Sequence, residues 1–155
     1  MRGETIAWNT TLANLPAVSK HAVINDGQEF AVAQDFRSKL NIRSPNVFAR
    51  TVNLSGGNQQ KVVLSKWLFS EPEVLILDEP TRGIDVGAKY EIYTIIAQLA
   101  AEGKCVIMIS SEMPELLGMC DRICVLNEGA FVAEFPAAEA TQEKIMRSIV
   151  TSGVN

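Results

Sequence analysis

The sequence predicts an α/β fold in which helices flank a parallel sheet, with a small helical subdomain before it. Three short apolar runs rich in β-branched residues predict the strands: Val74–Leu77, Val106–Ile109 and Ile123–Leu126. Helical patterns separate these runs, as parallel strands require. Before Val52 the chain is more polar and weakly patterned. We therefore expect residues 1–52 to be part of a helical subdomain and residues 53–155 to form the α/β part.

The composition points to one folded body. A chain of 155 residues, 47% of them apolar, is long enough to bury one full core. Lys and Arg number 14 against 18 Asp and Glu, and no dense basic run occurs, so we expect no nucleic-acid partner. The N-terminus lacks a signal-peptide core, and no run approaches the ~20 apolar residues that span a bilayer. We expect a cytoplasmic chain that reaches a membrane only through a partner.

The first helix is predicted between two turn signals. Asn25–Gly27 and Ser44–Asn46 bracket a helix over Gln28–Leu40. Four residues near helical spacing would give this helix an apolar face: Phe30, Ala33, Phe36 and Leu40.

A helix between the first two apolar runs would make a parallel crossover. Ile92, Ile96 and Leu99 repeat at i, i+4 and i+7, and Gly103 stands where a left-handed residue ends a helix. A second, shorter crossover, with Pro114 in the first turn of its helix, would return the chain in the third strand.

The C-terminal part predicts a turn, a strand and a helix. Asn127–Gly129 is typical of a tight turn into a last strand over Ala130–Phe135. Thr141 would cap an amphipathic helix that carries Ile145 and Ile149.

The segment Leu54–Lys61 is the first candidate for chemistry. Gly56 and Gly57 leave backbone N–H groups unobstructed at a helix N-terminus, where unpaired amides and the helix dipole favour an anion such as phosphate. The hydroxyl of Ser55 adds one more donor. Taken alone, the same three residues are more typical of a plain cap or turn.

Two adjacent acids follow the first apolar run. Asp78 and Glu79 would lie at the carboxyl edge of the sheet, where open α/β folds bind ligands. There Asp78 could hold a magnesium ion or its water, and Glu79 could polarise a water that attacks a terminal phosphate. The plainer alternative is that both acids only start a loop, but the Ser-Gly-Gly segment upstream favours the phosphate site.

Together these motifs resemble the later part of an ATP-binding cassette. Leu54–Asn58 is similar to the Leu-Ser-Gly-Gly-Gln signature, Val74–Glu79 to the Walker B strand with its catalytic glutamate, and Gly83–Asp85 to the D-loop. The resemblance implies a P-loop NTPase-like sheet, ATP and Mg²⁺ as cofactors, Asp78 as the metal ligand and Asp85 as a link between the two nucleotide sites of a cassette dimer.

The resemblance is closer still to the second cassette of double-cassette bacterial importers for monosaccharides such as ribose, galactose and xylose. Three segments carry it: Leu54–Lys61, Asp78–Lys89 and Ser110–Glu115. It implies a second cassette and membrane permease subunits as partners, a periplasmic sugar-binding protein as an indirect one, and a location peripheral to the inner membrane. It does not identify the sugar.

Three departures from the cassette pattern stand out. No Gly-x-x-x-x-Gly-Lys-Ser/Thr occurs, so the chain resembles a cassette truncated before its Walker A half. Ser111 stands where the family usually has a switch histidine, and a serine carries no positive charge. Asn58 replaces the glutamine of the signature. Both replacements are typical of second cassettes in the sugar-importer group.

These departures imply a division of roles. Ser55, Gly56 and Gly57 would bind the ATP of the opposite cassette, while Asp78 and Glu79, with Ser111, would face a degenerate site of their own. The chain alone is expected to bind ATP poorly and to self-associate through surface that truncation exposes. The alternative is a non-hydrolysing dimerisation or regulatory module. A DNA-maintenance ATPase fits poorly, because the chain is acidic and has no long heptads.

Overall fold

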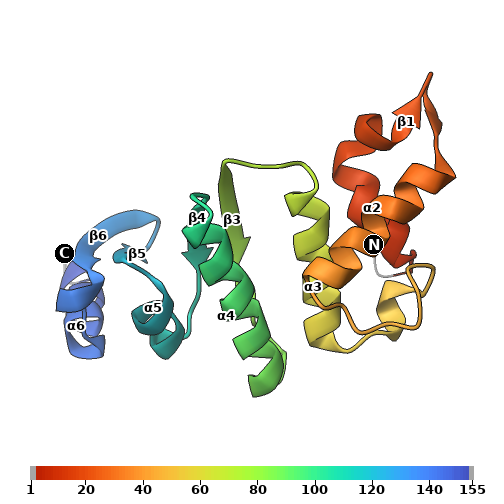
Figure 1. Cartoon of the computed structure of the whole chain (residues 1–155). Coiled ribbons are helices and arrows are strands. Elements are labelled where there is room, and N and C mark those ends of the chain that lie inside the picture. Colours follow the sequence, from red (N-terminus) through yellow and green to blue (C-terminus); the bar gives the residue numbers. More distant parts are fainter. Residues whose placement is uncertain (1–2, 154–155) are drawn as a thin grey trace. The chain divides into compact units, whose positions relative to one another are not determined.

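A computed structural model describes residues 3–153 as two compact units, with the boundary between Ile107 and Met108 (Figure 1). Unit 1 contains the helices that precede the first apolar strand and that strand itself, and the second apolar strand crosses the boundary. Unit 2 contains the third apolar strand and the C-terminal helix. Among the described residues, no helix combines the length and the apolar character that crossing a membrane requires.

Unit 1 opens with helices and one small hairpin. Its elements up to the signature helix are α1 (Ile6–Thr11), η1 (Leu12–Val18), β1 (Ser19–Lys20), β2 (Val23–Ile24), α2 (Asp26–Lys39), η2 (Thr51–Asn53) and α3 (Gly56–Leu68). The predicted helix over 28–40 is confirmed as α2, which begins two residues earlier because Asn25 caps it by accepting a hydrogen bond from the Gln28 amide at 3.1 Å. Its expected apolar face is only partly covered: Ala33 is buried, whereas Phe30 is 44% exposed and stacks on Phe48.

Helix α1 is the common packing neighbour of α2 and α3. It packs against both, and Ala7 shares a buried cluster with Ala33 and Val47. The hydroxyls of Thr10 in α1 and Ser65 in α3 lie 3.0 Å apart and are fully buried. A buried hydroxyl needs a partner, so this pair fixes α3 against α1.

The elements that follow are β3 (Val74–Asp78), α4 (Val86–Ala101) and β4 (Cys105–Ile109), the last of which crosses the boundary between the units. The two strands are neighbours in a two-stranded parallel sheet, and α4 is the crossover between them. Gly103, at φ +88°, ends the connection as predicted.

Burial alternates along β3. Leu75 and Leu77 are buried, whereas Val74 is 51% and Ile76 is 63% exposed. The sequence predicts a buried strand, and the structure buries only alternate residues of it. Successive strand residues point to opposite faces, and only one face of β3 is covered.

Unit 2 consists of α5 (Met113–Met119), β5 (Arg122–Asn127), β6 (Ala130–Pro136), η3 (Ala137–Glu139) and α6 (Gln142–Ser152). The third apolar run does form a strand, but β5 pairs with β6 in an antiparallel hairpin rather than with a parallel neighbour. The reason is the tight turn at Glu128 and Gly129, both at positive φ, which lays the next strand directly beside β5.

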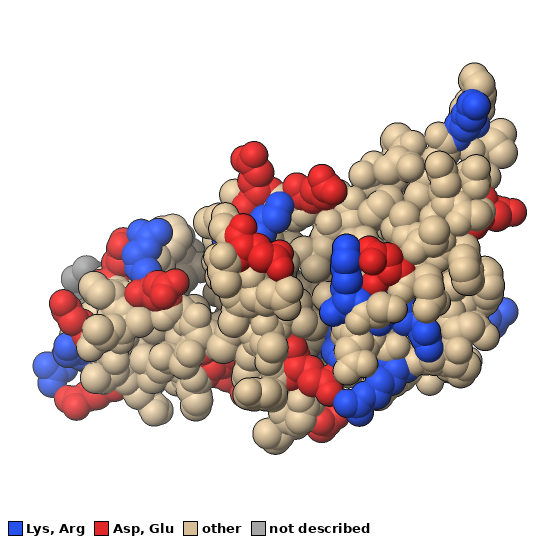
Figure 2. Space-filling model, viewed as in Figure 1, with Lys and Arg blue, Asp and Glu red and all other residues tan. Residues whose placement is uncertain are grey.

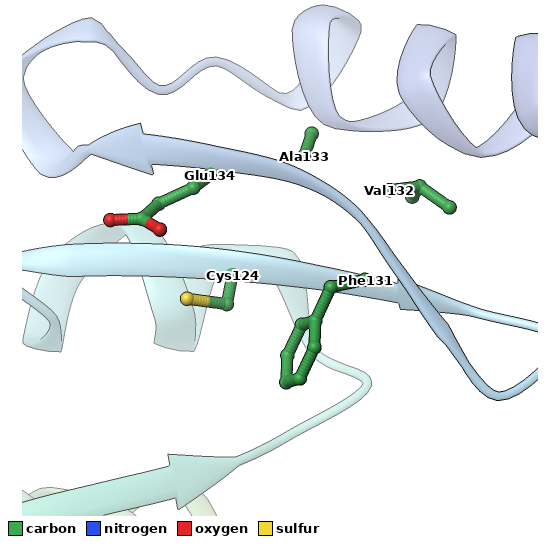
Figure 3. A pocket seen from close by; sticks show the side chains of 5 residues that line it. All are labelled: Cys124, Phe131, Val132, Ala133 and Glu134. Carbon is green, nitrogen blue, oxygen red and sulfur yellow. The ribbon is translucent and has the colours of Figure 1, made fainter.

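Helix α6 covers one side of this hairpin. Ile145 of α6 is buried with Ile123 and Val125 of β5, and Thr141 caps the helix by accepting from the Lys144 amide, as predicted. Figure 3 shows Cys124 and Phe131 on the opposite side of the hairpin, where Phe131 is 79% exposed. They line a shallow hollow together with Val132, Ala133 and Glu134.

Candidate functional site

The N-terminal turn of α3 presents unused donors. Ser55 is the N-cap residue, yet its side chain caps nothing. The first hydrogen bond of the helix runs from the Gln59 amide to the Ser55 carbonyl, at 2.9 Å, so the amides of Gly56, Gly57 and Asn58 precede the helical ladder. Gly56 and Ser55 are exposed. Ser55 thus caps α3 through its backbone carbonyl and keeps its hydroxyl out of the cap, so a phosphate-binding role for Ser-Gly-Gly stays a prediction.

The two glycines have different surroundings. A Cβ added to Gly57 would lie 2.5 Å from the Cβ of Ala88 in α4, which is closer than real atoms approach. A Cβ added to Gly56 would lie 3.1 Å from the Cγ2 of Ile84, a contact that a small shift relieves. Gly57 is therefore required where α3 meets α4, a packing role that the sequence does not reveal.

A pocket of about 260 Å³ opens between the N-termini of α3 and α4. Asp85, which resembles the D-loop aspartate, caps α4 by accepting from the Ala88 amide at 2.9 Å. The pocket is lined by Arg43, Ser55, Gly57, Asn58, Asp85, Gly87, Ala88 and Glu91. Three of the residues predicted to bind the cofactor, Ser55, Gly57 and Asn58, thus share one pocket with Asp85.

Two salt bridges that share Glu91 lie beside this pocket and are together called the Glu91 bridge. The Nζ of Lys61 donates to Glu91 Oε2 at 2.6 Å and to the carbonyl of Asn41 at 2.9 Å, while Arg43 Nη2 donates to Glu91 Oε1 at 2.8 Å. Basic and acidic side chains meet on the lower part of unit 1 in Figure 2. The hydrogen bond from Lys61, with the charges of Lys61 and Arg43, holds the pKa of Glu91 below its usual range. Glu91 is therefore ionised at neutral pH.

Sequence reasoning misses this bridge. Lys61 is 30 residues from Glu91, and Arg43 is 48 residues from it, so no local spacing links them. The one available signal is that Lys61 lies four residues after Gly57, on the same side of the predicted helix.

The acid pair lies at the carboxyl end of β3, as predicted. Asp78 is the last residue of the strand and is exposed, and Glu79 is partly buried. Glu79 has φ +47°, in the left-handed region that non-glycine residues rarely occupy. Its carbonyl accepts from the Arg82 amide at 3.2 Å, which closes the turn toward the D-loop-like segment.

The donor set at the acid pair limits which metal it could hold. Residues 3–153 contain no cluster of three or more His, Cys, Asp or Glu side chains suited to a metal. Mg²⁺ differs from most metals in being held by one or two carboxylates plus waters and substrate phosphates. Asp78 and Glu79 fit that need and would not form a complete protein cage.

Ser111 belongs to unit 2, in the segment before α5. Its neighbour Ser110 donates to the carboxylate of Glu115 and accepts from the Glu112 amide at 3.0 Å, which orders this segment. Asp78 and Glu79 belong to unit 1, so the role of Ser111 beside them stays a prediction.

The sequence matches the family described as "ABC transporter" over residues 4–82. It is 58% identical over 151 residues to the L-arabinose transport ATP-binding protein of Geobacillus stearothermophilus, with 97% of this chain and 29% of that protein covered. It is 49% identical over 154 residues to the ribose import ATP-binding protein of Clostridium perfringens, with 99% and 30% covered. The chain thus spans less than a third of these relatives.

Solved structures agree on the fold. The ATP-binding cassette MJ1267 of an ABC transporter superposes with a TM-score of 0.78 at 20% identity, with 95% of this chain and 63% of that chain covered. The ATP-binding cassette MJ0796, in a dimeric post-hydrolysis state bound to ADP and Pi, superposes with a TM-score of 0.73 at 19% identity, with 88% and 58% covered.

Proposed function

Because its family match extends over just over half of its length, this chain belongs to the ABC transporter family, and we propose that it serves as the signature-bearing part of the ATPase of a sugar importer. The observation that carries the proposal is the N-terminal turn of α3, where the Ser55 hydroxyl and the three amides that precede the helical ladder lie beside the pocket. The relatives are named for L-arabinose transport and ribose import, which supports sugar as the cargo class.

In this proposal the donors act in trans. A second cassette holds ATP, and Ser55, Gly56 and Gly57 donate to its terminal phosphate when the two cassettes close. Each hydrogen bond to a charged phosphate contributes about 1.5–3 kcal/mol. The amides supply fixed partial positive charge without any rearrangement.

The acid pair serves the nucleotide site of this chain's own cassette. Asp78 would hold Mg²⁺, which when bound neutralises charge on the phosphates. Glu79 would accept a proton from the attacking water. With Ser111 in place of a histidine that could carry positive charge, this second site would contribute less to turnover than the signature does.

The proposed partners follow from the family. The other cassette completes the ATP sandwich, membrane permease subunits receive the motion, and a periplasmic sugar-binding protein acts indirectly. The assembly would be cytoplasmic on this side, peripheral to the inner membrane.

A chimera provides the test. The matched 151 residues of the L-arabinose transport ATP-binding protein are replaced by this chain, and ATP turnover of the purified chimera is measured. We expect turnover, with Ser55→Ala lowering kcat about 10- to 100-fold and Glu79→Gln lowering it less. Ser70→Ala, which changes an exposed serine of unit 1, is the matched control and should leave kcat unchanged.

Three results would overturn the proposal. One is a chimera that is folded by circular dichroism yet hydrolyses no ATP. Another is a Ser55→Ala chimera with full turnover. The third is hydrolysis by the 155-residue chain alone with micromolar affinity for Mg-ATP, which would make a second cassette unnecessary.

A further inference from the structure

Asn58 makes two hydrogen bonds with its side chain. Its Oδ1 accepts from the Arg43 amide at 2.8 Å, and its Nδ2 donates to Ser55 Oγ at 2.8 Å. The orientation of the amide follows from chemistry, because a backbone N–H only donates and must face the oxygen of Asn58. The nitrogen of Asn58 then faces Ser55.

This orientation decides what the Ser55 hydroxyl does. Since Ser55 Oγ accepts from Asn58, its own proton is directed away from Asn58. Among residues 3–153 the structure gives this proton no acceptor, and Ser55 is exposed at the pocket. The hydroxyl is therefore left as a donor.

We propose that Asn58, held by Arg43, is a positioning residue that orients the Ser55 hydroxyl to donate its proton to a terminal phosphate. This inference rests on the proposed function, because it concerns how the signature turn meets a phosphate. It gives Asn58 a role through Ser55 rather than a contact of its own with ATP. Asn58 reaches both the Arg43 amide and Ser55, the N-cap residue three positions before it.

Arg43 is itself fixed from the other side. Its guanidinium donates to Glu91 Oε1, and Glu91 Oε2 accepts from Lys61, which is 1% exposed. A buried ammonium needs its partner, so Glu91 stays in place and presents its other oxygen to Arg43, whose side chain is 70% exposed. The relay thus runs from Lys61 and Glu91 through Arg43 and Asn58 to Ser55.

The first arm of the test needs no nucleotide. In the full 155-residue chain, proton–nitrogen NMR spectra report the Arg43 amide, which Asn58→Ala deprives of its acceptor. We expect the Arg43 amide proton to move upfield in Asn58→Ala and to stay in place in Ser55→Ala. Asn53→Ala, at an exposed asparagine in η2, is the matched control and should leave it unmoved. An unmoved Arg43 amide in Asn58→Ala would overturn the relay whether or not the chain serves an ATPase.

The second arm is a double-mutant cycle in the chimera. We expect Asn58→Ala to lower kcat about tenfold without raising KM for ATP, because the donor is used as the cassettes close. In the Ser55→Ala background, Asn58→Ala should cost nothing further, since its effect passes through that hydroxyl. Independent, multiplying losses would overturn the positioning role. Full turnover in Ser55→Ala alone would instead refute the proposed function and leave the NMR result standing.

Discussion

The start of α3 and the end of β3 carry the two halves of the predicted chemistry, and they are built differently. At α3, Ser55 and Asn58 belong to a network that reaches Arg43, Glu91 and Lys61 within unit 1. At β3, Asp78 is exposed, and Glu79 has a left-handed backbone. The comparison teaches that this chain preorganises its signature turn from its own residues, while the acid pair stores strain.

The largest expected effect is a loss of stability when the salt bridge between Lys61 and Glu91 is broken. Glu91→Ala removes the charge that faces buried Lys61 and should lower the free energy of unfolding by about 3 kcal/mol. This is the low end for buried pairs, because the Glu91 side chain is 34% exposed. Urea unfolding measures it. Glu143→Ala breaks the ion pair with Arg147. The Glu143 side chain is 83% exposed and that of Arg147 is 75% exposed, so this change should lower the free energy of unfolding by less than about 1 kcal/mol. Equal losses would show that the bridge is an ordinary surface pair.

Gly57→Ala should follow in size. The new Cβ would meet Ala88 at 2.5 Å and force α3 and α4 apart, at a cost of about 2 kcal/mol in unfolding free energy. Gly56→Ala is the matched control and should cost clearly less, since only the Ile84 methyl has to give way. Thermal unfolding of both variants measures the difference. Equal costs would contradict the close helix approach.

The pH dependence of stability should also report the network. The pKa of Glu91 is lowered by folding, so its contribution to stability is present above the unfolded pKa and is lost as pH falls through the folded value. We expect the wild type to lose more unfolding free energy between neutral pH and the acid range than Glu91→Gln does. Denaturant titrations at several pH values test this, and parallel curves would contradict it.

The smallest expected effect concerns the strained acid. Glu79→Gly relieves a left-handed backbone worth about 1–2 kcal/mol but adds the entropy cost of glycine, so stability should rise by about 0.5 kcal/mol. The same change should lower turnover in the chimera. Glu128→Gly, at φ +48° in the β5–β6 turn, isolates the strain and should raise stability without affecting turnover. A Glu128→Gly variant with lower stability would show that a glutamate in this backbone conformation is not strained.

Much of the fold could be predicted from local patterns. The cap at Thr141, the helix stop at Gly103 and the turn at Gly129 are encoded within a few residues, and the structure contains each of them. The partner of β5 was not predictable from its apolar run, because parallel and antiparallel strands of that length look alike and the following turn decides.

The candidate site likewise contains residues that could be predicted from the sequence and residues that could not. Ser55, Gly56, Asp78 and Glu79 stand out by residue type and by position next to a helix or strand end. The network around Glu91 depends instead on side chains brought together by helix packing, which no spacing in the sequence encodes.

The close approach of Gly57 and Ala88 limits which amino acids evolution can place at these two positions. What the junction limits is the combined volume of the two side chains, so neither residue is fixed by itself. A methyl group transferred from Ala88 to Gly57, by the exchange Gly57→Ala with Ala88→Gly, would keep that volume constant. Among homologous sequences these two positions should therefore covary inversely in size.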